Sequence, residues 1–218
     1  IGRFGGQVEG FVLASSRLGD EQIVAHSTRR PLVLINRDVE GIPRVLIDSA
    51  TGVAEAVEHL AALGHKRLVY VSGPHGSWSN KQRRNAVRRS ARQLGMEVSV
   101  ISNEYAAFES GRRQTANVLA TGATAAIAFD DLTAQGMLAE LLDRGISVPE
   151  QFSVVGCDDV LGAATYPALT TVSNRSVEAG KTALTLLIDI LENNAIRDVR
   201  YVLNTSLVVR GTTGPAAG

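Results

Sequence analysis

Residues 125–159, AAIAFDDLTAQGMLAELLDRGISVPEQFSVVGCDD, contain two apolar runs separated by a segment with helical periodicity. The runs Ala125–Phe129 and Ser153–Cys157 have the length of a strand and no polar alternation, which is typical of parallel strands buried on both faces. Between them, Asp131–Arg144 repeats its apolar residues at helical spacing and is followed by Gly145, which suits a left-handed cap. This stretch therefore predicts one β-α-β unit of a parallel sheet.

The same alternation continues outward from this unit in both directions. Further strands are predicted at Val8–Ala14, Pro31–Ile35, Arg67–Val71 and Val98–Ile101. Further helices are predicted at Asp20–Ser27, Thr51–Leu63, Ser79–Leu94, Glu109–Ala120 and Val177–Glu192, with Gly64 and Gly95 as caps. Alternating units of this size favour right-handed crossovers and an α/β fold of doubly wound parallel sheets.

Composition excludes several classes of protein. The chain has 218 residues, 44% of them hydrophobic, and 22 cations balance 22 acids. Disorder needs low hydrophobicity and high net charge, and no run approaches the roughly 18 apolar residues of a membrane span. The single cysteine, Cys157, excludes an internal disulfide and favours a reducing compartment, so a cytoplasmic location is expected. Zero net charge disfavours DNA binding by bulk electrostatics.

Polar residues directly follow several of the predicted strands. They are Asn36-Arg37, Ser72-Gly73-Pro74, Asp130-Asp131 and Asp158-Asp159. Because ligands of open α/β sheets bind beyond the carboxyl ends of the strands, these residues predict a polar ligand-binding cleft.

Catalytic motifs fail when their spacing is examined. Gly180-Lys181-Thr182 resembles the end of a phosphate-binding loop, but Arg175 stands where that motif needs glycine, and the segment has helical periodicity. The histidines lack the spacing of zinc ligands and are interpreted as surface or helix-end residues; they are His26, His59, His65 and His75. We expect no enzymatic activity, no metal and no cofactor.

The predicted helix Ser79–Leu94 is strongly basic. Its cations are Lys81, Arg83, Arg84, Arg88, Arg89 and Arg92. Val87, Ala91 and Leu94 follow helical spacing and define an inward stripe, so most of these cations are expected in solvent. One arginine near the start of the helix is expected to point toward the cleft, and helical geometry alone does not choose between Arg83 and Arg84. The helix has no interleaved aromatic residues, which disfavours a nucleic-acid interface.

An ordered set of sequence phrases carries a family resemblance. They are VEGFVLASS (8–16), PLVLINR (31–37), HLAALGHKRLVYVSGP (59–74), the stretch 125–159 quoted above, YPALTTV (166–172) and LVVRGTT (207–213). In their order and spacing they resemble the ligand-sensing core of the lactose/galactose-repressor (LacI/GalR) family of bacterial transcription regulators. The resemblance covers about residues 8–213.

The resemblance implies a two-lobed, periplasmic-binding-protein-like fold. The amino-terminal lobe would hold residues 1–66 and 174–195, and the carboxyl-terminal lobe residues 67–173 and 196–218. Family members carry more of the first lobe upstream, preceded by a helix-turn-helix headpiece, so the first lobe is expected to be truncated here. The resemblance also implies operator DNA as a partner through that missing headpiece, and a homodimer.

Ligand residues follow from the resemblance where the phrases align. An arginine at the position of Arg84 grips ligand hydroxyls in this family, which selects Arg84 over Arg83. Asp158 matches a hydrogen-bond acceptor for ligand hydroxyls, and Asp130 stands where the family usually has Asn. The remaining matches are Asn36 in the first lobe, Asn174 at a crossover, and Phe108 or Tyr105 as an apolar platform. Val87 and Arg88 replace a Gly and an aromatic residue of the family pattern, so the pocket shape is expected to differ.

Carboxylates facing one arginine favour a neutral effector, because an anion would meet like charge at Asp130 and Asp158. A sugar or a nucleoside is therefore expected. The leading interpretation is a sensor, most simply a repressor, whose effector binding closes the lobes and allosterically controls operator binding. The alternative is a periplasmic sugar-binding protein of a transport system. A small α/β enzyme acting on sugars is a third interpretation, for which no catalytic residue can be named.

Overall fold

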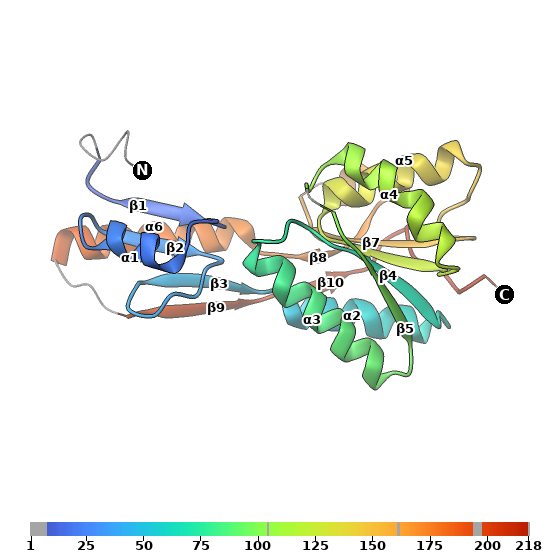
Figure 1. The fold of residues 1–218 in the computed structure, drawn as a ribbon, viewed down its shortest axis with the longest axis horizontal. Coiled ribbons are helices and arrows are strands. Elements are labelled where there is room, and N and C mark those ends of the chain that lie inside the picture. The colour runs from blue at the N-terminus through green and yellow to red at the C-terminus, as the bar shows by residue number, and fades with distance from the viewer. Residues whose placement is uncertain (1–7, 104, 161, 194–197, 218) are drawn as a thin grey trace. The chain divides into compact units, whose positions relative to one another are not determined.

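The computed structural model describes residues 8–103, 105–160, 162–193 and 198–217. The chain divides into two compact units, each built from segments that are far apart in the sequence (Figure 1). Unit 1 comprises residues 1–48, 77–79 and 175–203, and unit 2 comprises residues 49–76, 80–174 and 204–218. Both units have their own sheet and helices, so the expected two-lobed α/β fold is confirmed.

Unit 1 is a sheet in the order β1-β2-β3-β9 with helices on both faces. Its elements are β1 (Phe11–Ala14), α1 (Asp20–Ser27), β2 (Leu32–Ile35), β3 (Arg44–Asp48), α6 (Ser176–Asn193) and β9 (Arg200–Asn204). In β2, Leu34 packs with Ile23 of α1, whereas Val33 packs with Ala183 of α6. Because successive side chains of a strand point to opposite faces, an unbroken apolar run suits this doubly covered position.

Unit 2 is a larger sheet in the order β10-β8-β7-β6-β4-β5, parallel except for β10, which runs antiparallel to β8. Its helices are α2 (Ser49–Ala62), α3 (Trp78–Gln93), α4 (Phe108–Ala120), α5 (Asp131–Asp143) and the short 3-10 helix η1 (Gly162–Ala164). Its strands are β4 (Arg67–Val71), β5 (Glu97–Ile101), β6 (Ala125–Ala128), β7 (Ser153–Asp158), β8 (Thr170–Ser173) and β10 (Ser206–Val208).

Helices cover both faces of the unit 2 sheet, α2 and α3 on one side and α4 and α5 on the other (Figure 1). The strand order reverses at β4, since β5 lies on one side of it and β6 on the other. Such a reversal opens a crevice at the carboxyl ends of the two strands, where ligands of doubly wound sheets bind. The topology therefore predicts that a ligand binds at the loops after β4 and β6.

Helices α4 and α5 approach each other closely at two glycines. A Cβ added at Gly136 would lie 1.9 Å from the carbonyl oxygen of Phe108, and one added at Gly111 would lie 2.1 Å from that of Thr133. Real Cβ atoms do not approach backbone oxygens so closely, so both positions need glycine if the helices keep this spacing.

The unit boundaries correct the expected lobes in two places. The expected amino-terminal lobe, 1–66 and 174–195, includes α2, whereas α2 lies in unit 2 and packs against β8 and β10. The expected carboxyl-terminal lobe, 67–173 and 196–218, includes β9, whereas β9 adjoins β3 in the unit 1 sheet. Chain order does not reveal which sheet a segment joins when its apolar face could cover either.

The last strands of the chain lie at sheet edges, β9 beside β3 and β10 beside β8. The chain then continues along unit 2, where Val154 N donates to the carbonyl of Thr212. His65, interpreted above as a surface or helix-end residue, does follow α2 but is only 2% exposed. Its Nδ1 lies 2.7 Å from Thr124 Oγ1, and its Nε2 lies 3.1 Å from the carbonyl oxygen of Gly214. The carboxyl-terminal segment is thus tied into the interior of unit 2.

Candidate functional site

A cluster of polar side chains lies at the carboxyl edge of the unit 2 sheet, beside the point where the strand order reverses. Helix α3 contributes Arg83 and Arg84, the end of β6 leads into Phe129 and Asp130, β7 ends at Asp158, and Asn174 follows β8. Three of the predicted ligand residues, Asp158, Asn174 and Asp130, thus follow or end strands of this one sheet.

Asn80, in the first turn of α3, fixes the loop that follows β4. It is 3% exposed, its Oδ1 accepts from Gly73 N at 3.0 Å and from the Tyr70 hydroxyl at 2.9 Å, and its Nδ2 donates to the Gly73 carbonyl at 2.9 Å. This network holds the start of α3 against the end of β4. Sequence reasoning did not single out Asn80, because an asparagine near a helix start is common in any protein.

Arg83 lies inside the fold. It is 3% exposed, its Nη2 donates to Asp158 Oδ1 at 2.8 Å, and its Nη1 donates to the carbonyl oxygen of Phe129. Its guanidinium also lies over the Phe129 ring, 5.0 Å from the ring centre. Helical geometry alone left open whether Arg83 or Arg84 points toward the cleft. In the structure, Arg83 is the arginine that contacts Asp158.

Asp158 adopts an unusual backbone conformation, with φ at +113°. Its Oδ1 accepts from both Arg83 and Asn174 Nδ2, whereas no described residue donates to its Oδ2. The side chain is 33% exposed. Burial raises the pKa of the Asp158 carboxyl above its usual 3.8, and the opposing charge of Arg83 offsets only part of this rise. One carboxylate oxygen is thus held by the protein, and the other is available.

The neighbouring polar groups leave further atoms without partners among the described residues. Arg84 is half-buried, with a buried Nε that makes no hydrogen bond, and the buried Oδ1 of Asn174 makes none either. Asp130 caps α5, where it accepts from Thr133 N at 2.8 Å. Because buried polar groups are nearly always paired, these atoms mark a place where a polar molecule can bind.

The charge balance of this edge corrects the picture of carboxylates facing one arginine. Two cations, Arg83 and Arg84, stand with the carboxylates of Asp130 and Asp158. The neighbouring Asp131 is 2% exposed, and its oxygens accept from the Thr171 hydroxyl at 2.5 Å and from Val160 N at 2.9 Å. The two arginines and these two carboxylates therefore balance in charge, which still suits a neutral ligand.

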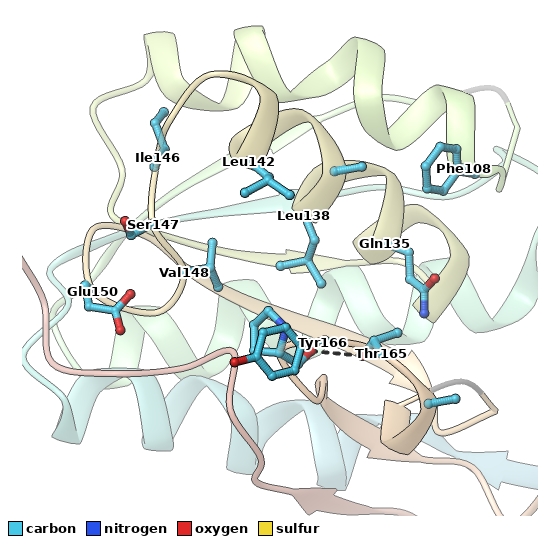
Figure 2. Close-up of a pocket in the computed structure, with 13 residues that line it drawn as sticks. Phe108, Gln135, Leu138, Leu142, Ile146, Ser147, Val148, Glu150, Thr165 and Tyr166 are labelled. Atoms are coloured by element: carbon cyan, nitrogen blue, oxygen red, sulfur yellow. Dashed lines mark hydrogen bonds between the residues drawn. The ribbon is translucent and has the colours of Figure 1, made fainter.

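Phe108 begins α4 and lines a different feature, a groove of about 740 Å³ along α5 (Figure 2). The groove is lined by none of the other predicted ligand residues. Its apolar walls come from Leu138, Leu142, Ile146, Val148, Tyr166 and Pro167. Tyr105, the alternative platform, is 67% exposed. A platform role for either aromatic residue stays a prediction.

Asn36 belongs to unit 1, where it directly follows β2. It has a left-handed backbone, with φ at +56°, and its Oδ1 accepts from Ile47 N at 3.1 Å. The side chain thus ties the end of β2 to β3, and its predicted ligand contact stays a prediction.

Helix α3 confirms most of the expected orientation of its cations. Val87 and Ala91 are fully buried, and Arg88, Arg89 and Arg92 are exposed. Leu94, assigned above to the inward stripe, is instead 45% exposed, because α3 ends at Gln93.

Other features have clear structural roles. Burial raises the pKa of the Cys157 thiol to about 12, so the thiol is not an activated nucleophile. Gly180-Lys181-Thr182 lies inside α6, as its periodicity predicted. Within the described ranges, no cluster of three or more His, Cys, Asp or Glu could hold a metal ion. None of the described helices combines the length and the hydropathy needed to cross a membrane.

Comparison with known proteins identifies the class to which this fold and site belong. Residues 57–213 match the family model of the periplasmic binding protein-like domain, and the chain belongs to that family. The resemblance to the LacI/GalR group is confirmed, because the relatives and the similar solved structures include transcription regulators of that group. The HTH-type transcriptional repressor CytR of Escherichia coli (strain K12) is 29% identical over 216 residues, which cover 95% of this chain and 63% of CytR. The chain thus spans less than two thirds of that relative.

Two solved structures extend the comparison. A LacI family transcriptional regulator from Enterococcus faecalis V583 with bound ribose is 28% identical, with a TM-score of 0.86, and the match covers 97% of this chain and 79% of that one. The lac repressor dimer bound to operator and the anti-inducer ONPF is 26% identical, with a TM-score of 0.84 and coverage of 97% and 76%. Both are similar to this chain over nearly its whole length.

Proposed function

We propose that this chain is the effector-sensing part of a DNA-binding transcription regulator, most simply a repressor. The observation that carries the proposal is the group of unpartnered polar atoms at the carboxyl edge of unit 2: Arg84 Nε, Asn174 Oδ1 and Asp158 Oδ2. Effector binding and operator binding would be coupled by a free energy that the two ligands exert on each other reciprocally. The similarity to CytR, a transcriptional repressor, supports this function.

The effector class follows from the same atoms. Arg84 offers hydrogen-bond donors, whereas Asp158 and Asn174 offer acceptors, and hydroxyl groups satisfy both kinds. The edge is balanced in charge, so a neutral sugar or nucleoside fits better than an anion. The ribose bound in the E. faecalis regulator supports a sugar-like effector. Asn36, Asp130 and Phe108 remain predicted contributors.

Titration calorimetry of this chain tests the effector class. Ribose, other neutral sugars and nucleosides are compared with sugar phosphates and organic acids at one pH and ionic strength. We expect binding among the neutral compounds, because an edge that is balanced in charge has no excess of cations to attract a phosphate or carboxylate. Binding confined to the anionic compounds would contradict the proposal, and turnover of any sugar would favour the enzyme interpretation instead.

A cytoplasmic location and a homodimer accompany this proposal. Operators read by symmetric regulators are pseudo-palindromic, so a two-fold dimer matches them. The alternative, a periplasmic sugar-binding protein, would need neither a cytoplasmic location nor a homodimer. The dimeric state of the lac repressor structure supports the dimer.

The groove along α5 is the surface that we assign to the second copy. Leu142 on its wall is 76% exposed, and Tyr166 is fully exposed (Figure 2). Around Leu142, Arg112 and Arg144 pair with Asp143 and Glu140, so charges of both signs are balanced there. An exposed apolar surface with balanced charges suits self-association, because an identical copy brings no excess of like charge.

Replacing Leu142 with Glu is expected to convert dimer to monomer, with a dimer dissociation constant raised on the order of 100-fold, because a desolvated carboxylate would enter the interface. Sedimentation equilibrium measures the change. Leu94→Glu is the matched control, since Leu94 is an exposed leucine that directly follows α3. A Leu142→Glu chain that dimerises as tightly as wild type would remove this groove from the interface.

A further inference from the structure

Helix α3 presents one continuous basic face to solvent. Between residues 81 and 92, the exposed side chains are those of Lys81, Asn85, Arg88, Arg89 and Arg92. Successive helical residues are about 100° apart, so these five fall within an arc of about 100°, and the face is about 16 Å long. On the opposite side of the helix, Val87 and Ala91 are fully buried. The basic face thus consists of four cations and one amide, without an acid.

The cations of the basic face have no ion-pair partner among the described residues. Surface arginines elsewhere on unit 2 do have partners. Arg112 Nη2 lies 2.6 Å from Asp143 Oδ2, and Arg144 Nε lies 2.9 Å from Glu140 Oε1. The positive charge of α3 is therefore not neutralised by the protein, although the whole chain has equal numbers of cations and acids.

This arrangement of charge opposes the stability of the helix. Arg88 and Arg92 are four residues apart, and Arg89 and Arg92 are three apart, so like charges are neighbours on the helix surface and repel. The first turn of α3 contains no acid, and Lys81 stands near the amino end, where a cation opposes the helix dipole. Acids at some of these positions would stabilise α3, so folding alone does not account for the basic face.

We propose that the basic face of α3 docks an acidic segment of another protein, whose Asp and Glu carboxylates pair with Lys81, Arg88, Arg89 and Arg92. Three of the four cations are arginines, and the planar fork of arginine can donate to both oxygens of one carboxylate. The face has no exposed apolar residue between 81 and 92, so charge supplies the attraction. This surface is separate from the proposed effector contacts, and its role does not depend on them.

Nucleic acid is the other polyanion that arginines bind, and the surroundings of α3 favour a protein instead. The basic face has no aromatic side chain on which a base could stack, and Asn85 is its one uncharged group able to read a base edge. Helix α2, which covers the same side of the sheet, exposes Glu58, and Glu97 is exposed at the start of β5. A duplex has phosphates on both strands and needs a broader positive surface, whereas an acidic segment one helix wide matches this face.

A labelled acidic peptide tests the proposal. A peptide of about 20 residues, with Glu at every third or fourth position and Ala between, is long enough to span the basic face as a helix. Its fluorescence anisotropy is followed as the chain is added, beside the same peptide with Gln in place of every Glu. We expect only the Glu peptide to bind, and less tightly as salt is raised, because salt screens exposed charges. No binding of the Glu peptide, or equal binding of both peptides, overturns the proposal.

The combined variant Arg88→Gln, Arg89→Gln and Arg92→Gln tests the assignment to α3. It is expected to weaken binding of the Glu peptide roughly tenfold or more, because three exposed ion pairs are lost together. Its urea midpoint is expected to equal or exceed that of the wild type, because the repulsion on α3 is relieved. Binding of the Glu peptide that is unchanged in this variant overturns the proposal.

The matched control removes the same charge from other exposed positions. It combines Arg17→Gln, Arg29→Gln and Arg113→Gln, all outside α3. This variant is expected to bind the Glu peptide as the wild type does. An equal loss of binding in the control and in the α3 variant would show an effect of net charge alone and so overturn the proposal.

Labelled duplex DNA, titrated in the same way, separates the two kinds of partner. We expect the Glu peptide to bind more tightly than the duplex, and the three α3 substitutions to leave any weak binding of DNA almost unchanged. If the duplex bound more tightly than the peptide and the α3 substitutions removed that binding, the basic face would be a nucleic-acid site, and docking of an acidic protein segment would be overturned.

Discussion

Replacing Asp158 with Asn is expected to lower effector affinity roughly 100-fold, about 3 kcal/mol, because a charged acceptor for an effector hydroxyl becomes a neutral amide. The amide can also turn its NH₂ group toward Arg83, which leaves the buried guanidinium without an anion. The substitution therefore costs some folding stability too, so affinity is measured by calorimetry on protein whose fold has been verified by circular dichroism.

The pH dependence of binding gives this prediction a second signature. Since burial raises the pKa of Asp158, the carboxylate begins to take up a proton at a higher pH than an ordinary aspartate. Only the ionised form has a full charge to offer, so affinity is expected to fall as the pH falls toward that raised value. Asp158→Asn should abolish this fall.

Asp143→Asn is the control, because Asp143 is an exposed aspartate that is paired with Arg112 on the same unit. It is expected to leave both the affinity and its pH profile unchanged. Equal effector affinities of wild-type and Asp158→Asn chains would contradict the assignment of Asp158.

Replacing Gly136 with Ala is expected to destabilise unit 2 by about 3 kcal/mol or more. The new methyl group would lie 1.9 Å from a backbone oxygen of α4, which no rotation of a side chain can relieve, so the helices must move apart. Urea unfolding followed by circular dichroism measures the loss, and faster amide hydrogen exchange in α4 and α5 locates it.

Gly180→Ala provides the opposite result from the same chemical change. Gly180 is an exposed glycine of α6, with nothing within 4 Å of an added Cβ. Alanine favours helix over glycine by about 1 kcal/mol, so this variant is expected to be more stable than wild type. If Gly136→Ala were as stable as Gly180→Ala, the helices would not approach as closely as described.

Much of the fold could be predicted from the sequence, because the helical periodicity extends over many residues in each helix. Each predicted helix begins and ends within two residues of its observed bounds. Gly64, Gly95 and Gly145 have the expected left-handed conformation, with φ of +89°, +66° and +71°. Strands β3, β8, β9 and β10 were not predicted. They are three to five residues long, and β9 is largely exposed, so none forms a distinctive apolar run.

The site was predictable in outline and not in detail. Polar residues after strands pointed to the carboxyl edge, where Asp130, Asp158 and Asn174 do lie. Periodicity cannot distinguish Arg83 from Arg84, because successive helical residues are about 100° apart and both border the apolar stripe. Only the position of Asp158 relative to α3 shows that Arg83 is the internal partner.

The placement of β9 and β10 at the sheet edges has a consequence for biosynthesis. Synthesis runs from the amino to the carboxyl end, so residues 200–208 are made after β3 and β8, the strands beside which they lie. Until then, β3 and β8 lack these neighbours and keep unpaired backbone groups, which are templates for aggregation. Neither sheet is complete until residues 200–208 have been made, so chaperone protection of the nascent chain matters most before that point.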